Sequence, residues 1–433
     1  MTYPITLIFI FLVFWRPQEW LLPEMFGWPV LQIITVISLV GLFVGIHEKT
    51  ERFPKTPAVM LAVGLWFASI MSHVAHGYFQ GILNTYQETF KVSLLLILLL
   101  VVISRVDRAR GVILMFVLAG VVMSAHALLQ KATGFGFAGS APLWVYDYDL
   151  NIMKSRSQFF GIFGDPNDLG QFLVCTIPLV FAYPRRLTPV PFMMSCGVAW
   201  FIFMGLLSTG SRGAQVALIA AVSTFVIMKF PRRWVPYLAV VGLVAGLIAC
   251  AVGGSSLLDA SARERLDYWG LGNQVFKANP LFGIGYGMFW MVAGDRAAHN
   301  AFVLCYTELG IFGYWFWFSV LQLGIIGCWR TRVAFSRPRT GAQKYMKRLS
   351  ELSIVSMVGF SVGAYFLSRA YTFPYFFLFG LLCAVPMIAE RMLPEEHPPL
   401  TDYRADVLGS GTIATLLSIV YVYLSILVLN RGR

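Results

Sequence analysis

Charged side chains are scarce in this chain of 433 residues, because Asp, Glu, Lys and Arg together make up only 12% of it. Hydrophobic residues account for 58%, and the mean hydropathy is +0.71. This composition argues against a soluble domain and indicates an integral membrane protein. Acidic residues are the rarer kind, with 21 against 33 basic ones, which gives a net charge of +12.

Several motifs of familiar chemistry are also missing. The six cysteines lie inside apolar runs without paired metal-ligand spacing, so we expect small packing residues and neither disulfides nor a zinc site. The chain has no HExxH, no phosphate-cradling glycine loop and no acidic pair that would hold a divalent ion beside a nucleotide. Nucleotide hydrolysis is therefore not expected, and no metal or other cofactor is predicted.

Long apolar runs recur along the whole chain. Since a helix needs about 20 mostly apolar residues to cross a bilayer, the sequence predicts an all-α, polytopic membrane protein with about 12–14 transmembrane helices. The runs are 5–22, 29–46, 58–73, 85–103, 112–130, 166–183, 191–208, 214–230, 235–252, 300–329, 352–368, 374–389 and 411–429. The first run is interrupted at 16–19 and is expected to be an anchor, since it has no basic start and no cleavage site.

The positions of the basic residues predict the orientation, because short basic loops stay in the cytoplasm. The basic loops around Arg105, Arg185, Lys229 and Arg330 each follow an even number of spans if the N-terminus is cytoplasmic. The positive charge then reflects topology and attraction to membrane lipids, and no nucleic-acid partner is expected. The predicted parts are membrane helices at 1–130, 166–252 and 299–433, and external segments at 131–165 and 253–298, the second forming a loop subdomain.

The first external segment combines aromatic and acidic residues, such as Trp144, Tyr146 and Asp147, with Arg156. Such a mixture suits a carbohydrate, because aromatic rings stack on sugars and carboxylates accept hydrogen bonds from hydroxyls. An aromatic belt at the membrane interface is the alternative for the aromatics. The segment ends in 165–167, Asp-Pro-Asn, which predicts a turn and a helix start.

The second external segment contains a predicted amphipathic helix at 259–269, expected to lie on the membrane surface. Its arginines, Arg263 and Arg265, are either functional or part of a solvated face paired with Glu264 and Asp267. The glycine-rich turn at 279–287 follows, and we expect it to let the backbone approach a ligand closely.

Two further residues stand out by position. Arg212 lies in a tight external turn, against the positive-inside trend, which favours a functional role over snorkelling to lipid headgroups. His299, followed by Asn300, begins a long apolar run after a polar segment, so its titratable nitrogen indicates proton chemistry at the membrane surface. The alternative is that both residues cap the following helix.

Together these motifs resemble the bacterial O-antigen ligase and O-antigen polymerase family. The resemblance covers about residues 156–313. It depends on the order of four motifs: Arg156 with residues 161–167, residues 211–214, residues 279–287, and residues 299–300 with residues 308–310. It implies a GT-C-like membrane enzyme of the bacterial inner membrane with its active site facing the periplasm. It also implies an undecaprenyl-diphosphate-linked glycan as donor, and a glycan or lipid A-core as acceptor.

The chemistry of such a donor fits the residue types. Arginine binds phosphate oxygens bidentately and stays charged, so Arg212 and Arg265 are expected to clamp the diphosphate, with Arg156 as a third contact. His299 is the expected general base for the acceptor hydroxyl, in a metal-independent and inverting reaction. The remaining candidates for substrate binding are Asp165, Asn167, Arg263, Tyr268 and Asn300.

The acceptor is the main open question. A polymerase of surface polysaccharide, either O-antigen or exopolysaccharide, is slightly favoured over an O-antigen ligase, and a protein O-glycan ligase needs the same clamp and base. A flippase for lipid-linked oligosaccharide is the alternative of another class, but the polar residues gather at the outer face and not at the bilayer midplane. Whether a chain-length regulator binds the cytoplasmic basic loop stays open.

Overall fold

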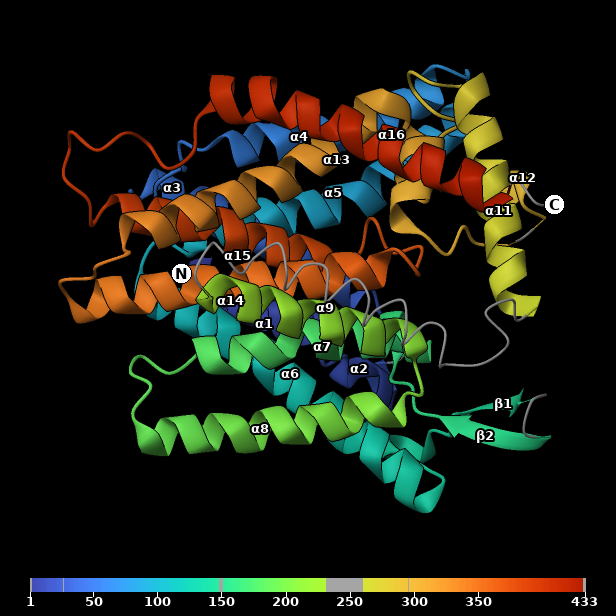
Figure 1. Ribbon diagram of the computed structural model, residues 1–433, viewed down its shortest axis with the longest axis horizontal. Coiled ribbons are helices and arrows are strands. Elements are labelled where there is room, and N and C mark those ends of the chain that lie inside the picture. Colours follow the sequence, from blue (N-terminus) through green and yellow to red (C-terminus); the bar gives the residue numbers. More distant parts are fainter. Residues whose placement is uncertain (1, 26, 148–150, 231–259, 295, 431–433) are drawn as a thin grey trace. The chain divides into compact units, whose positions relative to one another are not determined.

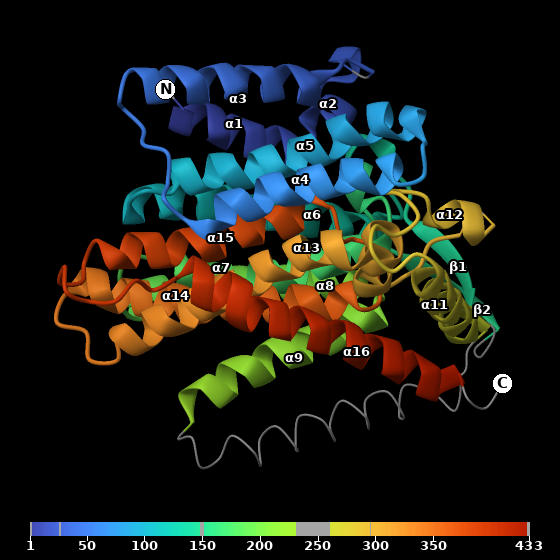
Figure 2. The ribbon, with the colours of Figure 1, turned by 90° about the horizontal axis from the view of Figure 1, so that it is seen from above.

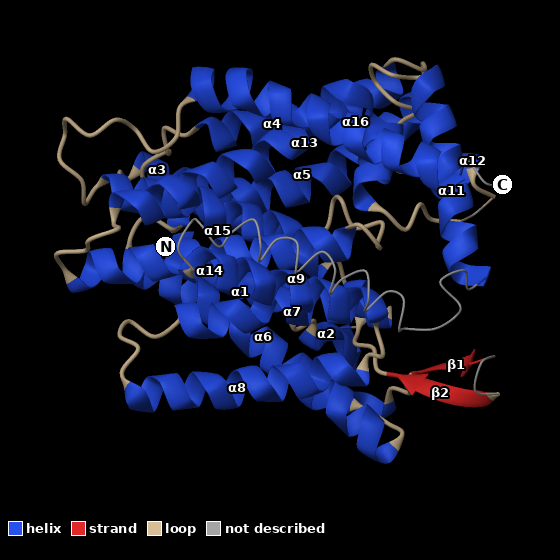
Figure 3. Ribbon diagram, viewed as in Figure 1, coloured by secondary structure: helices blue, strands red, loops and turns tan. Residues whose placement is uncertain are grey.

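The computed structural model describes residues 2–25, 27–147, 151–230, 260–294 and 296–430. Among these residues, the regular secondary structure is helical except for one two-stranded sheet (Figure 3). The predicted all-α membrane fold is confirmed. The chain divides into two compact units, the first formed by Met1–Phe53, Val101–Leu238 and Phe335–Gly363, and the second by Pro54–Leu100, Ala239–Ala334 and Ala364–Arg433.

The first unit is built around α7, labelled in Figure 1. Nearly every residue of this helix is buried. This helix packs against α6, α8 and α9, while α1 packs against α3 and α6. The elements of the unit are α1 (Thr2–Phe14), α2 (Pro17–Trp20), η1 (Pro23–Met25), α3 (Val30–His47), α6 (Val106–Thr133), η2 (Phe137–Gly139), β1 (Leu143–Asp147), β2 (Ile152–Arg156), η3 (Gly161–Phe163), α7 (Pro166–Ala182), α8 (Pro189–Ser208), α9 (Arg212–Lys229) and α14 (Gly341–Ala364).

The second unit is built around the long helix α13, which packs against α4, α11, α15 and α16. Helix α11 runs across the ends of α13 and α16 and not along them (Figures 1 and 2). The elements are α4 (Pro57–Val74), α5 (Phe79–Val102), α11 (Ala260–Ala278), α12 (Phe289–Val292), α13 (Ala301–Ala334), α15 (Phe373–Glu390), the π-helical turn η5 (Tyr403–Gly409) and α16 (Ser410–Asn430).

Nine helical segments in the described part of the chain are long and apolar enough to cross a membrane. They are α3, α4, α5, α6, α8, α9, α13, α15 and the continuous segment Tyr403–Asn430. Three other predicted spans correspond to α1, α7 and α14, which fall short of these limits of length or apolarity. The predicted span 235–252 lies outside the described residues. The chain is a multi-pass membrane protein.

The predicted first span, 5–22, is wrong in its extent. Helix α1 ends at Phe14, and Arg16 adopts a left-handed conformation with φ 50° before Pro17 begins α2. A proline cannot continue a helix without losing a backbone hydrogen bond, so the chain turns at this point. The apolar residues of α1 still pack inside the first unit, where Phe9 and Phe14 are fully buried.

Helix α13 is broken at Gly310, where φ is 64° and ψ is −167°. The break releases backbone groups that an unbroken helix would pair internally, and the loop that follows α11 binds them. The four hydrogen bonds run from Ile284 N to Thr307 O (3.0 Å), from Gly285 N to Glu308 O (3.0 Å), from Ile311 N to Pro280 O (2.8 Å) and from Phe312 N to Leu281 O (3.1 Å). The glycine-rich turn therefore approaches the backbone of α13 closely, and its predicted approach to a ligand stays a prediction.

We expect Gly283→Ala to destabilise the protein more than Gly287→Ala. Both glycines have a positive φ, 66° and 68°, so both alanines carry a backbone strain of about 1–2 kcal/mol. A Cβ at residue 283 would also lie 2.3 Å from the carbonyl carbon of Glu308, whereas a Cβ at residue 287 meets nothing within 4 Å. The additional clash should cost about 1–3 kcal/mol. Thermal unfolding of the purified variants in detergent measures the difference, and equal midpoints would contradict the observed approach.

Candidate functional site

Arg156 is the last residue of the hairpin formed by β1 and β2, a pair of strands that the sequence did not predict. The hairpin carries the guanidinium to the start of two helices. Its Nε donates to the carbonyl oxygen of Thr209 at 3.0 Å, and its Nη2 donates to Oδ1 of Asn167 at 2.9 Å. Two hydrogen bonds on one side of the planar group fix its orientation.

The helices that meet there are α7 and α9, which begin side by side. Asp165 caps α7, since its Oδ1 accepts from the backbone N of Asn167 at 2.6 Å. Ser211 caps α9 by accepting from Ala214 N at 3.2 Å, and its hydroxyl donates to Oδ1 of Asn167 at 2.8 Å. Gly170 permits this contact, because a Cβ there would lie 2.8 Å from the Cβ of Ala214.

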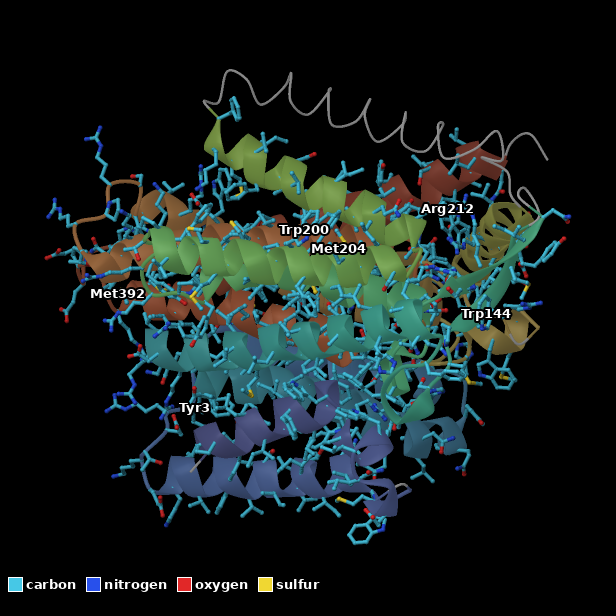
Figure 4. The ribbon with its side chains drawn as sticks, turned by 90° about the horizontal axis from the view of Figure 1, so that it is seen from below. Tyr3, Trp144, Trp200, Met204, Arg212 and Met392 are labelled. Atoms are coloured by element: carbon cyan, nitrogen blue, oxygen red, sulfur yellow. The ribbon has the colours of Figure 1, made fainter. Side chains whose placement is uncertain are left out.

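Arg212 is the first residue of α9, and its side chain is exposed (Figure 4). The preceding turn requires Gly210, whose φ of 60° is strained for other residues and which lies beside the side chain of Arg156. The first unit thus gathers Arg156, Asn167 and Arg212 around two helix N-termini. Such ends carry partial positive charge and backbone N–H groups, so the arrangement favours binding of an anion.

Two predicted substrate-binding residues of the first unit have structural contacts here. The carboxylate of Asp165 caps α7, and the amide oxygen of Asn167 accepts from both Arg156 and Ser211. Asn167 therefore orients the Arg156 guanidinium by accepting a charge-assisted hydrogen bond from it. The helix-start prediction from the Asp-Pro-Asn sequence is confirmed.

In the second unit His299 precedes α13 and has a φ of 50°, which is uncommon for a residue with a Cβ. Its backbone N donates to Oγ of Ser368 at 2.6 Å, and the preceding carbonyl, of Ala298, accepts from Trp269 Nε1 at 2.9 Å. The capping alternative is confirmed for Asn300, whose Oδ1 accepts from the backbone N of Phe302 (3.0 Å) and of Val303 (3.1 Å). His299 lies outside the helix, with its side chain half-buried.

Helix α11 carries the other predicted residues of the second unit. Arg263, Arg265 and Tyr268 all belong to it. Residues four apart share one side of a helix, so Arg265 lies on the side of Trp269, which contacts the segment before His299. Trp269 is only 6% exposed, and α11 packs against α13 and α16. One face of this helix is therefore packed against protein, and its predicted place at the membrane surface stays a prediction.

Tyr268 and its neighbours form a polar group on α11. The hydroxyl of Tyr268 donates to Oε1 of Glu264 at 3.1 Å, and Arg296 Nε lies 3.8 Å from the same oxygen. Partial burial, followed by the hydrogen bond to Glu264, raises the pKa of Tyr268 above its ordinary value. The phenol consequently stays neutral and can donate a hydrogen bond at neutral pH.

Sequence reasoning missed Thr209, Ser368 and the anchoring role of Trp269. The contact of Ser368 with His299 joins residues that are 69 positions apart, and a single serine between two apolar helices gives no local signal. In the described part of the chain, no group of three or more His, Cys, Asp or Glu side chains is placed to hold a metal ion.

Comparison with known proteins identifies the segment that contains most of these motifs. A model of the O-antigen ligase family matches residues 197–318, a range that begins inside α8 and ends inside α13 and includes Arg212, Arg265 and His299. No curated protein sequence matches the chain. The match indicates a role of ligase or polymerase type in glycan assembly. Residues 197–318 are therefore similar to the O-antigen ligase family, the family that the sequence motifs resemble.

Proposed function

We propose that this protein is a glycosyltransferase that moves a glycan from undecaprenyl diphosphate to an acceptor hydroxyl at the periplasmic face of the bacterial inner membrane. The observation that carries this proposal is the cluster at the N-termini of α7 and α9. There Asn167 and Thr209 orient Arg156, and Arg212 begins the second helix. The match to the O-antigen ligase family supports the same chemistry.

The leaving group in this reaction is a diphosphate, whose charge grows as the bond to the sugar C1 breaks. Arg212 and Arg265 are proposed to bind the diphosphate oxygens, with Arg156 as a third contact. Preorganised donors are most effective where charge develops in the transition state. Helix N-termini add fixed positive potential without any proton transfer. The proposed mechanism therefore needs no metal ion to stabilise the leaving group.

His299 is proposed as the general base that takes the proton of the acceptor hydroxyl. The ordinary pKa of histidine lies near neutrality, which suits this role. One base and one held leaving group imply a single displacement with inversion at the anomeric carbon. Four further residues are proposed to contact the substrate: Asp165, Arg263, Tyr268 and Asn300. Because Oδ1 of Asn300 caps α13, Asn300 would contact the substrate through its other groups.

We favour a second lipid-linked glycan as acceptor, which makes the protein a polymerase of surface polysaccharide. The acidic Gly164-Asp165-Pro166-Asn167-Asp168 sequence and the compact second external segment support this choice over lipid A-core. Both reactions use the same donor, so the acceptor alone separates them. Membrane lipids are the other proposed partners.

The first experiment compares wild-type protein with His299→Ala and Arg212→Ala, using purified undecaprenyl diphosphate oligosaccharide as donor. We expect a ladder of longer glycans from donor alone. Loss of the general base should slow transfer by about 10²–10⁴-fold. Loss of Arg212 should also abolish the ladder, because the departing diphosphate loses a charged contact. Gel analysis of labelled product measures each rate.

Other results of this experiment would change the proposal. Transfer that requires lipid A-core would identify a ligase, while the donor and the base would remain as proposed. Full activity of both variants would exclude these residues from the chemistry. Absence of any transfer by the wild type, together with movement of lipid-linked sugar across vesicle membranes, would replace the transferase with a flippase.

Arg156→Lys should weaken transfer although it keeps the charge. Lysine cannot reproduce the planar group that donates to both Thr209 and Asn167. Loss of hydrogen bonds from a charged group should lower kcat/KM by about 10-fold. Arg110→Lys is the matched control, because the Nε of Arg110 also donates to a backbone carbonyl, that of Tyr183, in a predicted cytoplasmic loop. Equal effects of the two substitutions would argue against a specific role for Arg156.

Chelation provides a separate test of the metal-independent mechanism. Since arginines and helix N-termini are proposed to stabilise the diphosphate, saturating EDTA should leave the transfer rate unchanged. The control is the same assay with added magnesium, which should not raise the rate. A rate that falls with EDTA and returns with one divalent metal would show that a cation performs the role assigned to arginine.

A further inference from the structure

His299 adopts a backbone conformation that must be maintained by its surroundings. Its φ of 50° lies in the left-handed region, where the Cβ crowds the following carbonyl. Non-glycine residues persist there only when neighbouring contacts determine the conformation, and such residues cluster at functional sites. The direction of the Cα–Cβ bond follows the backbone, so φ also determines where the imidazole points.

Three consecutive residues are anchored by three different elements. Trp269 of α11 donates to the carbonyl of Ala298 at 2.9 Å, and Asn300 caps α13. Between them, the backbone N of His299 itself donates to Ser368 Oγ at 2.6 Å. The contacts of Ala298 and Asn300 hold the chain immediately before and after His299. The contact with Ser368 is made by the amide whose rotation defines φ of His299.

The segment that contains Ser368 is itself well anchored between α14 and α15. Leu367 N donates to the carbonyl of Ala364 at 3.4 Å, and the carbonyl of Ala370 accepts from Trp317 Nε1 at 2.8 Å. Trp317 is fully buried in α13. The hydroxyl of Ser368 is thus carried by a backbone segment that hydrogen bonds hold in place. A residue that orients a second residue needs such support.

We propose that Ser368 is a positioning residue, which holds His299 in the left-handed conformation from which its imidazole reaches the acceptor hydroxyl. This inference rests on the proposed role of His299 as general base. Without the Ser368 oxygen, the amide of His299 loses its acceptor and the residue can relax to a negative φ. The imidazole would then swing away from the proton that it has to take.

The experiment measures kcat and KM for the lipid-linked donor with full-length Ser368→Ala. We expect kcat to fall by about 100-fold, the effect of a small misplacement of a catalytic group, while KM stays within about twofold. Ser368→Thr keeps the hydroxyl and should restore most of the rate. Ser350→Ala is the matched control, since Ser350 donates to the carbonyl oxygen of Lys347 within its own helix, α14, and should leave kcat unchanged.

The outcomes separate this inference from the proposed function. If His299→Ala abolishes transfer but Ser368→Ala retains the wild-type kcat, Ser368 does not position the base. If His299→Ala is fully active, the proposed general base is wrong as well. Should Ser368→Ala fail to fold, Ser368→Cys replaces the hydroxyl with a weaker acceptor of similar size. An intermediate kcat with unchanged thermal stability then supports the proposal, and a wild-type kcat overturns it.

Discussion

The exchange of backbone hydrogen bonds between α13 and the loop before it is the constraint on which the second unit depends. A break in a buried helix leaves carbonyl and amide groups that must find partners, because an unpaired buried group is costly. The loop supplies four bonds around Gly310. Gly283 and Gly310 are required there since a Cβ at either would lie 2.3 Å from backbone atoms of the other segment. The glycine-rich turn and the break of α13 at Gly310, which are more than twenty residues apart, therefore form one hydrogen-bonded structure.

The position of His299 follows from this exchange. The last of these backbone bonds before His299 is made by Gly285. Beyond it, Glu308 Oε1 accepts a hydrogen bond from the backbone N of Phe289 at 3.2 Å, and this bond holds α12 against α13. The chain returns at Asn300, which caps the same helix. The segment 286–299 is thus attached to α13 at both of its ends, by Gly285 and by Asn300. A residue held in this way can keep a strained conformation, because the packing of a long helix offsets the cost.

The sequence predicted those features that depend on local composition. Apolar runs identified the spanning helices, and Asp165 followed by Pro166 identified the start of α7, because hydropathy and capping act within a few residues. The hairpin of β1 and β2 has no such signal, since apolar and polar residues do not alternate cleanly along its two five-residue strands. The anchoring role of Ser368 depends on contact between distant segments, which periodicity cannot reveal. The glycine-rich turn was recognised as a place of close backbone approach, and the structure shows one such approach, to the backbone of α13.

The two candidate groups of residues have different physical characters, and this difference suits a division of chemical roles. Arginines and helix N-termini keep their positive charge throughout the physiological pH range, so a diphosphate held by them is bound equally well at any such pH. A histidine changes its charge near neutrality. In the proposed reaction, the pH dependence of transfer should therefore report on His299 and not on donor binding. In this proposal, the strained backbone of His299 adds to the separation, because it would fix the direction of the imidazole without placing any further charge beside the diphosphate.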